Sequence, residues 1–151
     1  MLGERTEETE KSMRTIERVD SVSGMKFATA VNCMDGRTQL PVIAYLKERC
    51  RVDCVDMVTE AGPVRILADL TDGTLVGSIR HRVEISAKKH GSRCIAVVGH
   101  SDCAGNPVSE EIQREQIRKS IKTVLSWNFM VSVLGLWIDE NWTVHEVNDE
   151  T

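Results

Sequence analysis

Residues 94–105 read CIAVVGHSDCAG. The first six of them are apolar at successive positions, which is typical of a strand in a parallel sheet with both faces covered. Two side chains that can bind a metal, His100 and Cys103, follow at once. In open parallel sheets, functional groups collect at the carboxyl ends of the strands. This segment therefore predicts a buried strand that delivers a histidine and a cysteine to one edge of a parallel sheet.

Strands and helices alternate through the rest of the chain. We expect further strands over residues 27–33, 53–59 and 130–138, and a short edge strand over 143–147. We expect helices over residues 38–48, 72–90 and 110–127, with Ser109 as the N-cap of the last and Pro41 tolerated only in the first turn of the first. This alternation predicts an α/β fold: a mostly parallel central β-sheet with flanking helices.

The size and charge of the chain narrow the classes of function. Its 151 residues suffice for one domain with a hydrophobic core. We divide it into residues 1–24, an N-terminal helical arm or flexible segment, and residues 25–151, the folded domain. The net charge of −4 gives no reason to expect nucleic acid as a partner. We also expect no membrane association and, because no signal-peptide pattern opens the sequence, a cytoplasmic location.

The five cysteines are many for a reducing compartment. Their odd number, without a signal peptide, argues against a disulfide framework and for buried thiols, metal ligands or reactive thiols. Cys50 and Cys54 could be half of a second metal site, but no other pair faces them, so we expect both to be buried. Cys94 begins a strand and is expected in the core.

His100-x-x-Cys103 offers two metal ligands, and Cys33, at the end of a neighbouring predicted strand, supplies a third. Two thiolates and one imidazole form a Cys₂His set, which leaves the fourth tetrahedral position of a zinc ion open. An open position is the mark of a catalytic zinc site, because water or substrate can occupy it. The sequence therefore predicts one Zn²⁺ per chain.

Asp35 and Arg37 follow Cys33 at intervals of two residues. In an extended backbone such residues point to the same side. A guanidinium pairs well with a carboxylate through two parallel hydrogen bonds, so Arg37 can hold Asp35 ionised close to the metal. Asp35 could accept a proton or hydrogen bond from water at the metal, or it could become the fourth ligand and close the site.

Cys33-x-Asp35-x-Arg37, followed by His100-x-x-Cys103-x-Gly105, resembles the β-class carbonic anhydrases over residues 26 to about 147. The resemblance implies reversible hydration of carbon dioxide to bicarbonate by a zinc-bound hydroxide. It implies Cys33, His100 and Cys103 as the zinc ligands, and Asp35 with Arg37 as the catalytic pair. It also implies a homodimer or higher homo-oligomer with the active site near the subunit interface.

The chain departs from this family after the second strand, where Thr59-Glu60-Ala61-Gly62-Pro63 replaces the usual Arg-Asn-Ala-Gly. Glu60 is either a pocket residue or a loop charge. One alternative function is therefore hydrolysis of carbonyl sulfide or carbon disulfide. Another is a non-catalytic zinc-binding regulatory protein, with Asp35 closing the site.

The remaining candidates have simple structural explanations. Gly62 and Gly105 are expected to serve turns, although a backbone N–H beside either could meet an anion. Asp102 could orient a ligand or cap a turn. Surface positions are expected for His81, His90 and His145, and core or interface positions for Trp127, Trp137 and Trp142.

Overall fold

A computed structural model describes residues 24–148 of the chain. Its elements are β1 (Phe27–Cys33), α2 (Gly36–Arg49), β2 (Cys54–Glu60), α3 (Pro63–Asp69), α4 (Gly73–Lys89), β3 (Cys94–His100), α5 (Glu110–Ser126), β4 (Ser132–Ile138) and β5 (Val144–Val147). The expected arm over residues 1–24 lies, except for its last residue, outside the described residues and stays a prediction.

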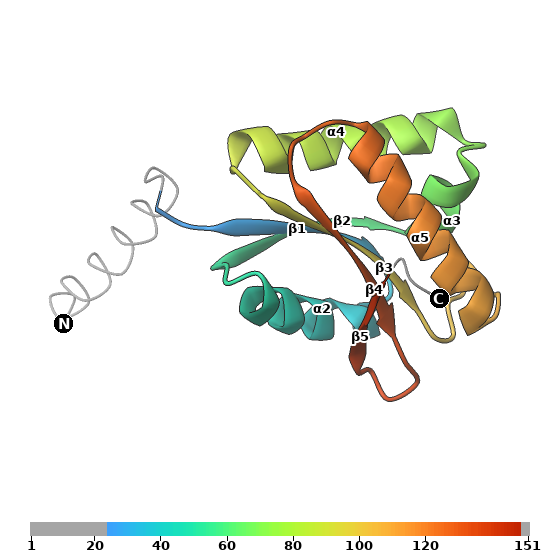
Figure 1. The fold of residues 1–151 in the computed structure, drawn as a ribbon. Helices are drawn as coiled ribbons and strands as arrows, with labels where there is room; N and C mark the ends of the chain where they lie inside the picture. The colour runs from blue at the N-terminus through green and yellow to red at the C-terminus, as the bar shows by residue number, and fades with distance from the viewer. Residues whose placement is uncertain (1–23, 149–151) are drawn as a thin grey trace, which may run out of the picture.

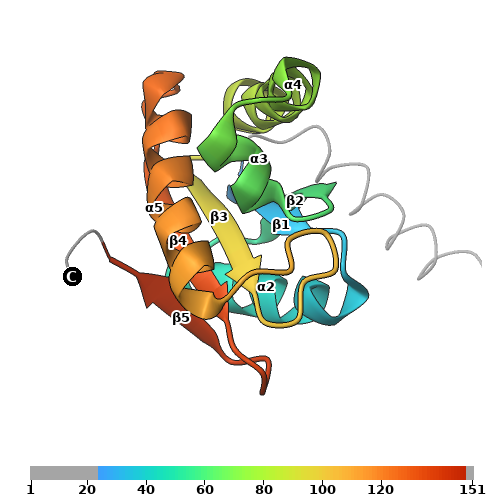
Figure 2. The ribbon, with the colours of Figure 1, turned by 90° about the vertical axis from the view of Figure 1, so that its right-hand side faces the viewer.

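The strands form one sheet in the order β2-β1-β3-β4-β5. β1 pairs in parallel with β2 and β3, and β3 pairs in parallel with β4. Only β5 is antiparallel to its neighbour. Helix α2 covers one face of the sheet, while α3, α4 and α5 cover the other (Figures 1 and 2). The predicted α/β fold with a mostly parallel sheet is confirmed.

Each face of the sheet has its own apolar layer, because alternate residues of a strand point to opposite faces. On the side of α2, the buried residues are Ala30, Val42, Leu46, Ala96, Val98, Leu136 and Ile138. On the other side, valines and isoleucines of β1, β2 and β3 pack against Leu67 of α3, Ile79 of α4 and Ile117 of α5. β3 is buried along its whole length, as its apolar sequence predicts.

Two helices differ from the prediction. α2 begins at Gly36 because the Asp35 carboxylate caps it, accepting a hydrogen bond from the Arg37 N–H at 2.9 Å. Pro41 therefore lies in the second turn, and its predicted first-turn position was wrong. Helix α3 was not predicted at all. It has seven residues, too few for helical periodicity to show, although Pro63 at its first position is a start signal.

The carboxyl ends of β1 and β3 lie at the same edge of the sheet because the two strands are parallel neighbours. Cys33 is the last residue of β1 and His100 is the last residue of β3. The loop from Ser101 to Ser109 leaves this edge before α5 begins. The topology thus brings the two predicted ligand segments together.

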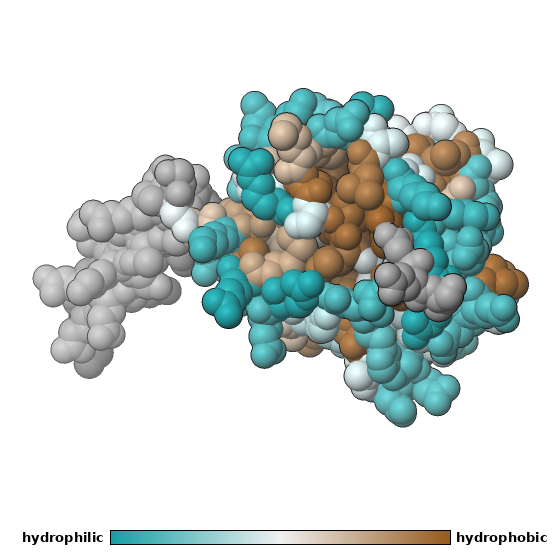
Figure 3. All heavy atoms as spheres, in the orientation of Figure 1, coloured by the Kyte–Doolittle hydropathy of each residue, from teal (hydrophilic) through white to brown (hydrophobic). Residues whose placement is uncertain are grey.

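An apolar surface is exposed beside β4, on the face seen in Figure 3. β5 pairs only with Gly135–Ile138, so within residues 24–148 the first three residues of β4 have no partner strand on that side. Ile121, Val133, Leu134 and Val147 line a hollow of about 140 Å³ there. Among residues 24–148, no helix combines the length and the apolar character needed to cross a membrane.

Candidate metal centre

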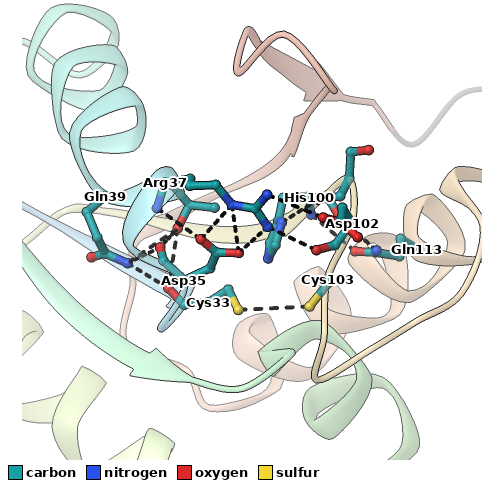
Figure 4. Close-up of polar contacts among 10 residues, drawn as sticks. Cys33, Asp35, Arg37, Gln39, His100, Asp102, Cys103 and Gln113 are labelled. Atoms are coloured by element: carbon teal, nitrogen blue, oxygen red, sulfur yellow. Dashed lines mark hydrogen bonds and ion pairs between the residues drawn. The ribbon is translucent and has the colours of Figure 1, made fainter.

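The three predicted zinc ligands lie together and are buried. The possible ligand atoms of Cys33, His100 and Cys103 all lie within 4.8 Å of one another (Figure 4). The two Sγ atoms are 3.9 Å apart. A tetrahedral zinc with Zn–S bonds of about 2.3 Å would place its two sulfur ligands roughly 3.8 Å apart. The spacing of the thiols therefore fits a zinc ion.

The imidazole of His100 is oriented for metal binding. Its Nδ1 lies 2.7 Å from the carbonyl oxygen of Ser101, which can only accept, so in the neutral ring Nδ1 carries the proton and Nε2 the lone pair. Nε2 is buried and has no hydrogen-bond partner in the structure. A buried polar atom without a partner is costly, and a metal-ligating histidine typically donates its other ring N–H to such a carbonyl.

Gln113 of α5 fixes the backbone of His100. Its Oε1 accepts from the His100 N–H at 3.1 Å, and its Nε2 donates to the His100 carbonyl at 2.8 Å. Glycine at position 99 lets the Gln113 side chain come this close to the backbone of β3, since a Cβ on Gly99 would lie 2.8 Å from Gln113 Oε1. Sequence reasoning missed Gln113. The available signal was a glutamine four residues before Ile117, on the apolar stripe of a predicted helix.

The pKa values of the two thiols move in opposite directions, so Cys33 is the thiolate and Cys103 keeps its proton. The hydrogen bond from Cys103 lowers the pKa of Cys33 to about 3, although burial opposes this. The pKa of Cys103 is correspondingly raised. The backbone N–H groups of Gly62 and Asp35 also favour the Cys33 thiolate, and that of Gly105 favours the Cys103 thiolate. The site is thus built to hold negative charge on sulfur.

Gly62 and Gly105 belong to two loops that touch backbone to backbone. Gly62 has a φ of +65°, and a Cβ there would lie 2.8 Å from the Gly105 carbonyl oxygen. A Cβ on Gly105 would lie 2.7 Å from the carbonyl carbon of Ala61. Only glycine fits both positions, so the predicted role of these glycines in turns holds. The close approach also brings their N–H groups to the thiols.

Asp35 and Arg37 form the predicted pair. Arg37 Nη2 donates to Asp35 Oδ2 at 2.7 Å, and Nε donates to Oδ1 at 3.1 Å. These hydrogen bonds are the main reason that the pKa of Asp35 falls to about 2. Asp35 is not a member of the group whose ligand atoms lie within 4.8 Å of one another. Its carboxylate is instead occupied by Arg37 and by the start of α2.

Arg37 is itself held from two further sides. Its Nη2 donates to the Asp102 carbonyl oxygen at 3.2 Å, and its Nη1 lies 3.3 Å from the Asp102 carboxylate. Its guanidinium carbon lies 4.5 Å from the centre of the Trp142 ring. Asp102 therefore contacts Arg37, a role that neither of its two expected explanations included. Trp142 belongs to the turn between β4 and β5.

Glu60, the last residue of β2, is partly buried and paired. Its carboxylate forms an ion pair with Arg82 of α4, and its backbone carbonyl accepts from the Met34 N–H at 2.8 Å. It is also the register partner of Cys33 across the two strands. The negative charge that distinguishes this loop is therefore compensated by an arginine of the same subunit.

The other candidate residues lie mostly as expected. His81, His90 and His145 are exposed, and Trp127 and Trp137 are in the core. His90 and His145 bind carboxylates, those of Asp56 and Asp139, each at 2.7 Å. Cys94 is buried, as predicted. Cys50 and Cys54 are only partly buried, so the expectation that both are buried was wrong.

Comparisons with known proteins identify a matching protein family and several similar structures. Residues 23–148 match the model of a protein family described as "Putative carbonic anhydrase". A tetrameric β-carbonic anhydrase from Sordaria macrospora superposes with a TM-score of 0.62 at 11% identity, covering 95% of this chain and 91% of that one. A β-carbonic anhydrase from Trichomonas vaginalis gives 0.54 at 16% identity, covering 92% and 94%.

A carbon disulfide hydrolase in its apo form is a further structural neighbour. Its TM-score is 0.50 at 11% identity, and the match covers 94% of this chain and 91% of that one. At such identities the structural likenesses show the fold alone. No curated protein sequence matches the chain.

Proposed function

The chain belongs to the family described as "Putative carbonic anhydrase", and on that premise we propose that it is a zinc-dependent lyase that reversibly hydrates carbon dioxide to bicarbonate. The observation that carries the proposal is the unpartnered Nε2 of His100, buried beside two thiols at a spacing that fits zinc. Cys33, His100 and Cys103 are the proposed ligands of one Zn²⁺ per chain. When bound, zinc supplies Lewis acidity that lowers the pKa of water to about 7.

Asp35 is the proposed acceptor of the proton or hydrogen bond from the reacting water. Its carboxylate oxygens are held by Arg37 at 2.7 and 3.1 Å, which keeps the group ionised and fixed in direction. Because this pairing and the helix cap occupy Asp35, they support a site whose fourth position stays available to water and substrate. They argue against the alternative in which Asp35 closes the site of a non-catalytic regulatory protein.

Hydrolysis of carbon disulfide or carbonyl sulfide is the second candidate function. It is supported by the fold shared with a carbon disulfide hydrolase and by the altered segment 59–63 beside the metal ligands. Both substrates are linear molecules with an electrophilic carbon, so the same water-activating residues would serve. The difference would lie in how the pocket accommodates sulfur.

The assembly and location belong to this proposal as well. We propose a homodimer or higher homo-oligomer, and the related enzyme from Sordaria macrospora is described as tetrameric. Light scattering coupled to gel filtration would measure the assembly. A cytoplasmic location and the absence of nucleic-acid partners stay predictions from the sequence.

The test is stopped-flow hydration of carbon dioxide by protein of verified zinc content, from about pH 6.5 to about pH 9, with Cys103→Ala as the control. We expect a rate that rises with pH and is absent from the variant. A zinc-loaded protein with no rate above buffer would contradict the lyase. Release of hydrogen sulfide from carbon disulfide by that same preparation would then establish the second candidate.

A further inference from the structure

Two cysteines make an unusually close contact at the end of β3 opposite the metal centre. Cys50 Sγ and Cys94 Sγ are 2.6 Å apart. A disulfide bond measures about 2.0 Å, whereas non-bonded carbon atoms pack at roughly 3.5–4.0 Å and sulfur is larger than carbon. The thiols of the metal centre, by comparison, are 3.9 Å apart. The Cys50–Cys94 contact is thus much nearer to a bond than to ordinary packing.

The backbone fixes this contact on both sides. Cys50 caps α2, and its N–H donates to the carbonyl of Leu46, a fully buried residue, at 2.9 Å. Cys94 opens β3, where it is in register with Ser132, and its carbonyl accepts from the Ser92 hydroxyl at 3.1 Å. Because neither residue lies in a free loop, the two sulfurs are brought together by the packing of α2 on the sheet.

We propose that Cys50 and Cys94 form a reversible disulfide by exchange with small-molecule disulfides. The Cys50 thiolate attacks one sulfur of the external disulfide, giving a mixed disulfide and releasing one thiolate. The Cys94 thiolate then attacks Cys50 Sγ and releases the second. Two thiols of the chain are oxidised to one disulfide, the external disulfide is reduced to two thiols, and the two protons pass to the released thiolates.

The surroundings assign the order of these two steps. Cys50 is partly exposed, whereas Cys94 is buried, and burial raises the pKa of Cys94 to about 12. Cys50 is therefore the group that meets an external reagent. Arg49, whose Nε donates to Glu146 at 2.6 Å, lies next to the pair and favours the thiolate of Cys94. The second step is intramolecular, which compensates for the low thiolate fraction of Cys94.

This disulfide would tie the last turn of α2 to the first residue of β3. The two cysteines are 44 positions apart in the chain, so the bond would close a long loop and restrict the unfolded chain. It uses neither Cys33 nor Cys103. The inference therefore stands independently of the proposed carbonic anhydrase activity and of zinc binding.

The test equilibrates the zinc-loaded full chain with mixtures of reduced and oxidised glutathione, traps free thiols by alkylation and maps the peptides. Cleavage before aspartate puts each of the five cysteines on a separate peptide, because Asp35, Asp53, Asp72 and Asp102 fall between them. We expect a linked pair of peptides 35–52 and 72–101. We also expect the oxidised protein to melt roughly 5–15 °C above the reduced protein, reversibly.

Three variants complete the design. Cys54→Ser should form the same linked pair as the wild type, while Cys50→Ser and Cys94→Ser should not. The wild-type peptide map alone is decisive if a variant fails to fold. A stable glutathione adduct on Cys50, a link between other cysteines in place of this one, or no link in fully oxidised glutathione would each overturn the proposal.

Discussion

The guanidinium of Arg37 stacks on the ring of Trp142, 4.5 Å from its centre. The two residues lie far apart in the sequence, one at the start of α2 and the other in the turn between β4 and β5. Since Arg37 also binds Asp35 and Asp102, its head group is held from three directions. We therefore expect Trp142 to be a positioning residue, which affects the proposed active site through Arg37.

Replacing Trp142 tests this role. A cation–π contact contributes about 0.5–2 kcal/mol, so Trp142→Ala should lower kcat/KM for carbon dioxide by roughly 2- to 30-fold. Trp142→Phe keeps an aromatic face and should retain most of the rate. Zinc content measured on both variants should equal that of the wild type. Loss of zinc from Trp142→Ala would instead assign Trp142 to the integrity of the metal centre.

Gln113→Leu should destabilise the protein by about 2–4 kcal/mol, because it leaves the buried N–H and carbonyl of His100 without partners. Urea denaturation of the metal-free protein measures this. Gln113→Glu keeps an acceptor for the His100 N–H but no donor when ionised, so it separates the two hydrogen bonds. A stability unchanged in Gln113→Leu would show that water replaces the glutamine.

Zinc should stabilise the folded chain, because its three proposed ligands come together only in the folded state. At free zinc concentrations 100 to 1,000 times the Kd, the gain is about 2.7–4.1 kcal/mol. Thermal unfolding with and without a chelator measures it. His100→Ala should abolish the gain, whereas His81→Ala, a change at an exposed histidine of α4, should leave it intact.

Alanine at Gly105 should destabilise the protein, since the added Cβ would lie 2.7 Å from the backbone of Ala61. The loops must separate to accept it, at a cost of about 1–3 kcal/mol. Gly77→Ala is the matched control: no atom lies within 4 Å of its Cβ, and alanine favours the interior of α4 by about 0.5–1 kcal/mol. Equal effects of the two substitutions would contradict the close contact of the loops.

Asp139 lies in the same turn as Trp142, and its contribution to the stability of the protein should depend on pH. The hydrogen bond with His145, and those from the Thr143 and Asn141 N–H groups, lower the pKa of Asp139. A depressed carboxyl pKa stabilises the fold fully above its ordinary value of about 4, and this is lost as the pH falls through the folded value. Asp139→Asn should therefore be less stable than the wild type at neutral pH. In urea denaturation the two should converge in acid; a constant difference would contradict the assignment.

The fold was largely predictable because its strands are short apolar runs and its longer helices show a clear periodicity. Helix α3 escaped prediction because seven residues carry no period and because Leu70 ends it in a left-handed conformation, which sequence does not announce. Pro41 was placed wrongly because the Asp35 cap starts α2 earlier than the apolar pattern does.

Part of the candidate site was likewise predictable from the sequence, and part was not. The ligand set and the Asp35–Arg37 pair follow from local spacing at the ends of two strands. The contacts of Arg37 with Trp142 and of Cys50 with Cys94 join segments that are distant in sequence, so no local pattern contains them. Gln113 lies between these cases, since a polar residue on an apolar stripe signals burial but does not identify its partner.

The proposed metal ligands are far apart in the sequence, so translation and strand pairing must precede assembly of the metal centre. Cys33 leaves the ribosome 70 residues before Cys103, and the two thiols meet only when β1 and β3 have paired. A single early cysteine holds zinc weakly, so the chain carries no finished metal centre during most of its translation. Acquisition of the metal would then report that β1 and β3 have paired, and zinc would be committed only to chains in which this part of the sheet had formed.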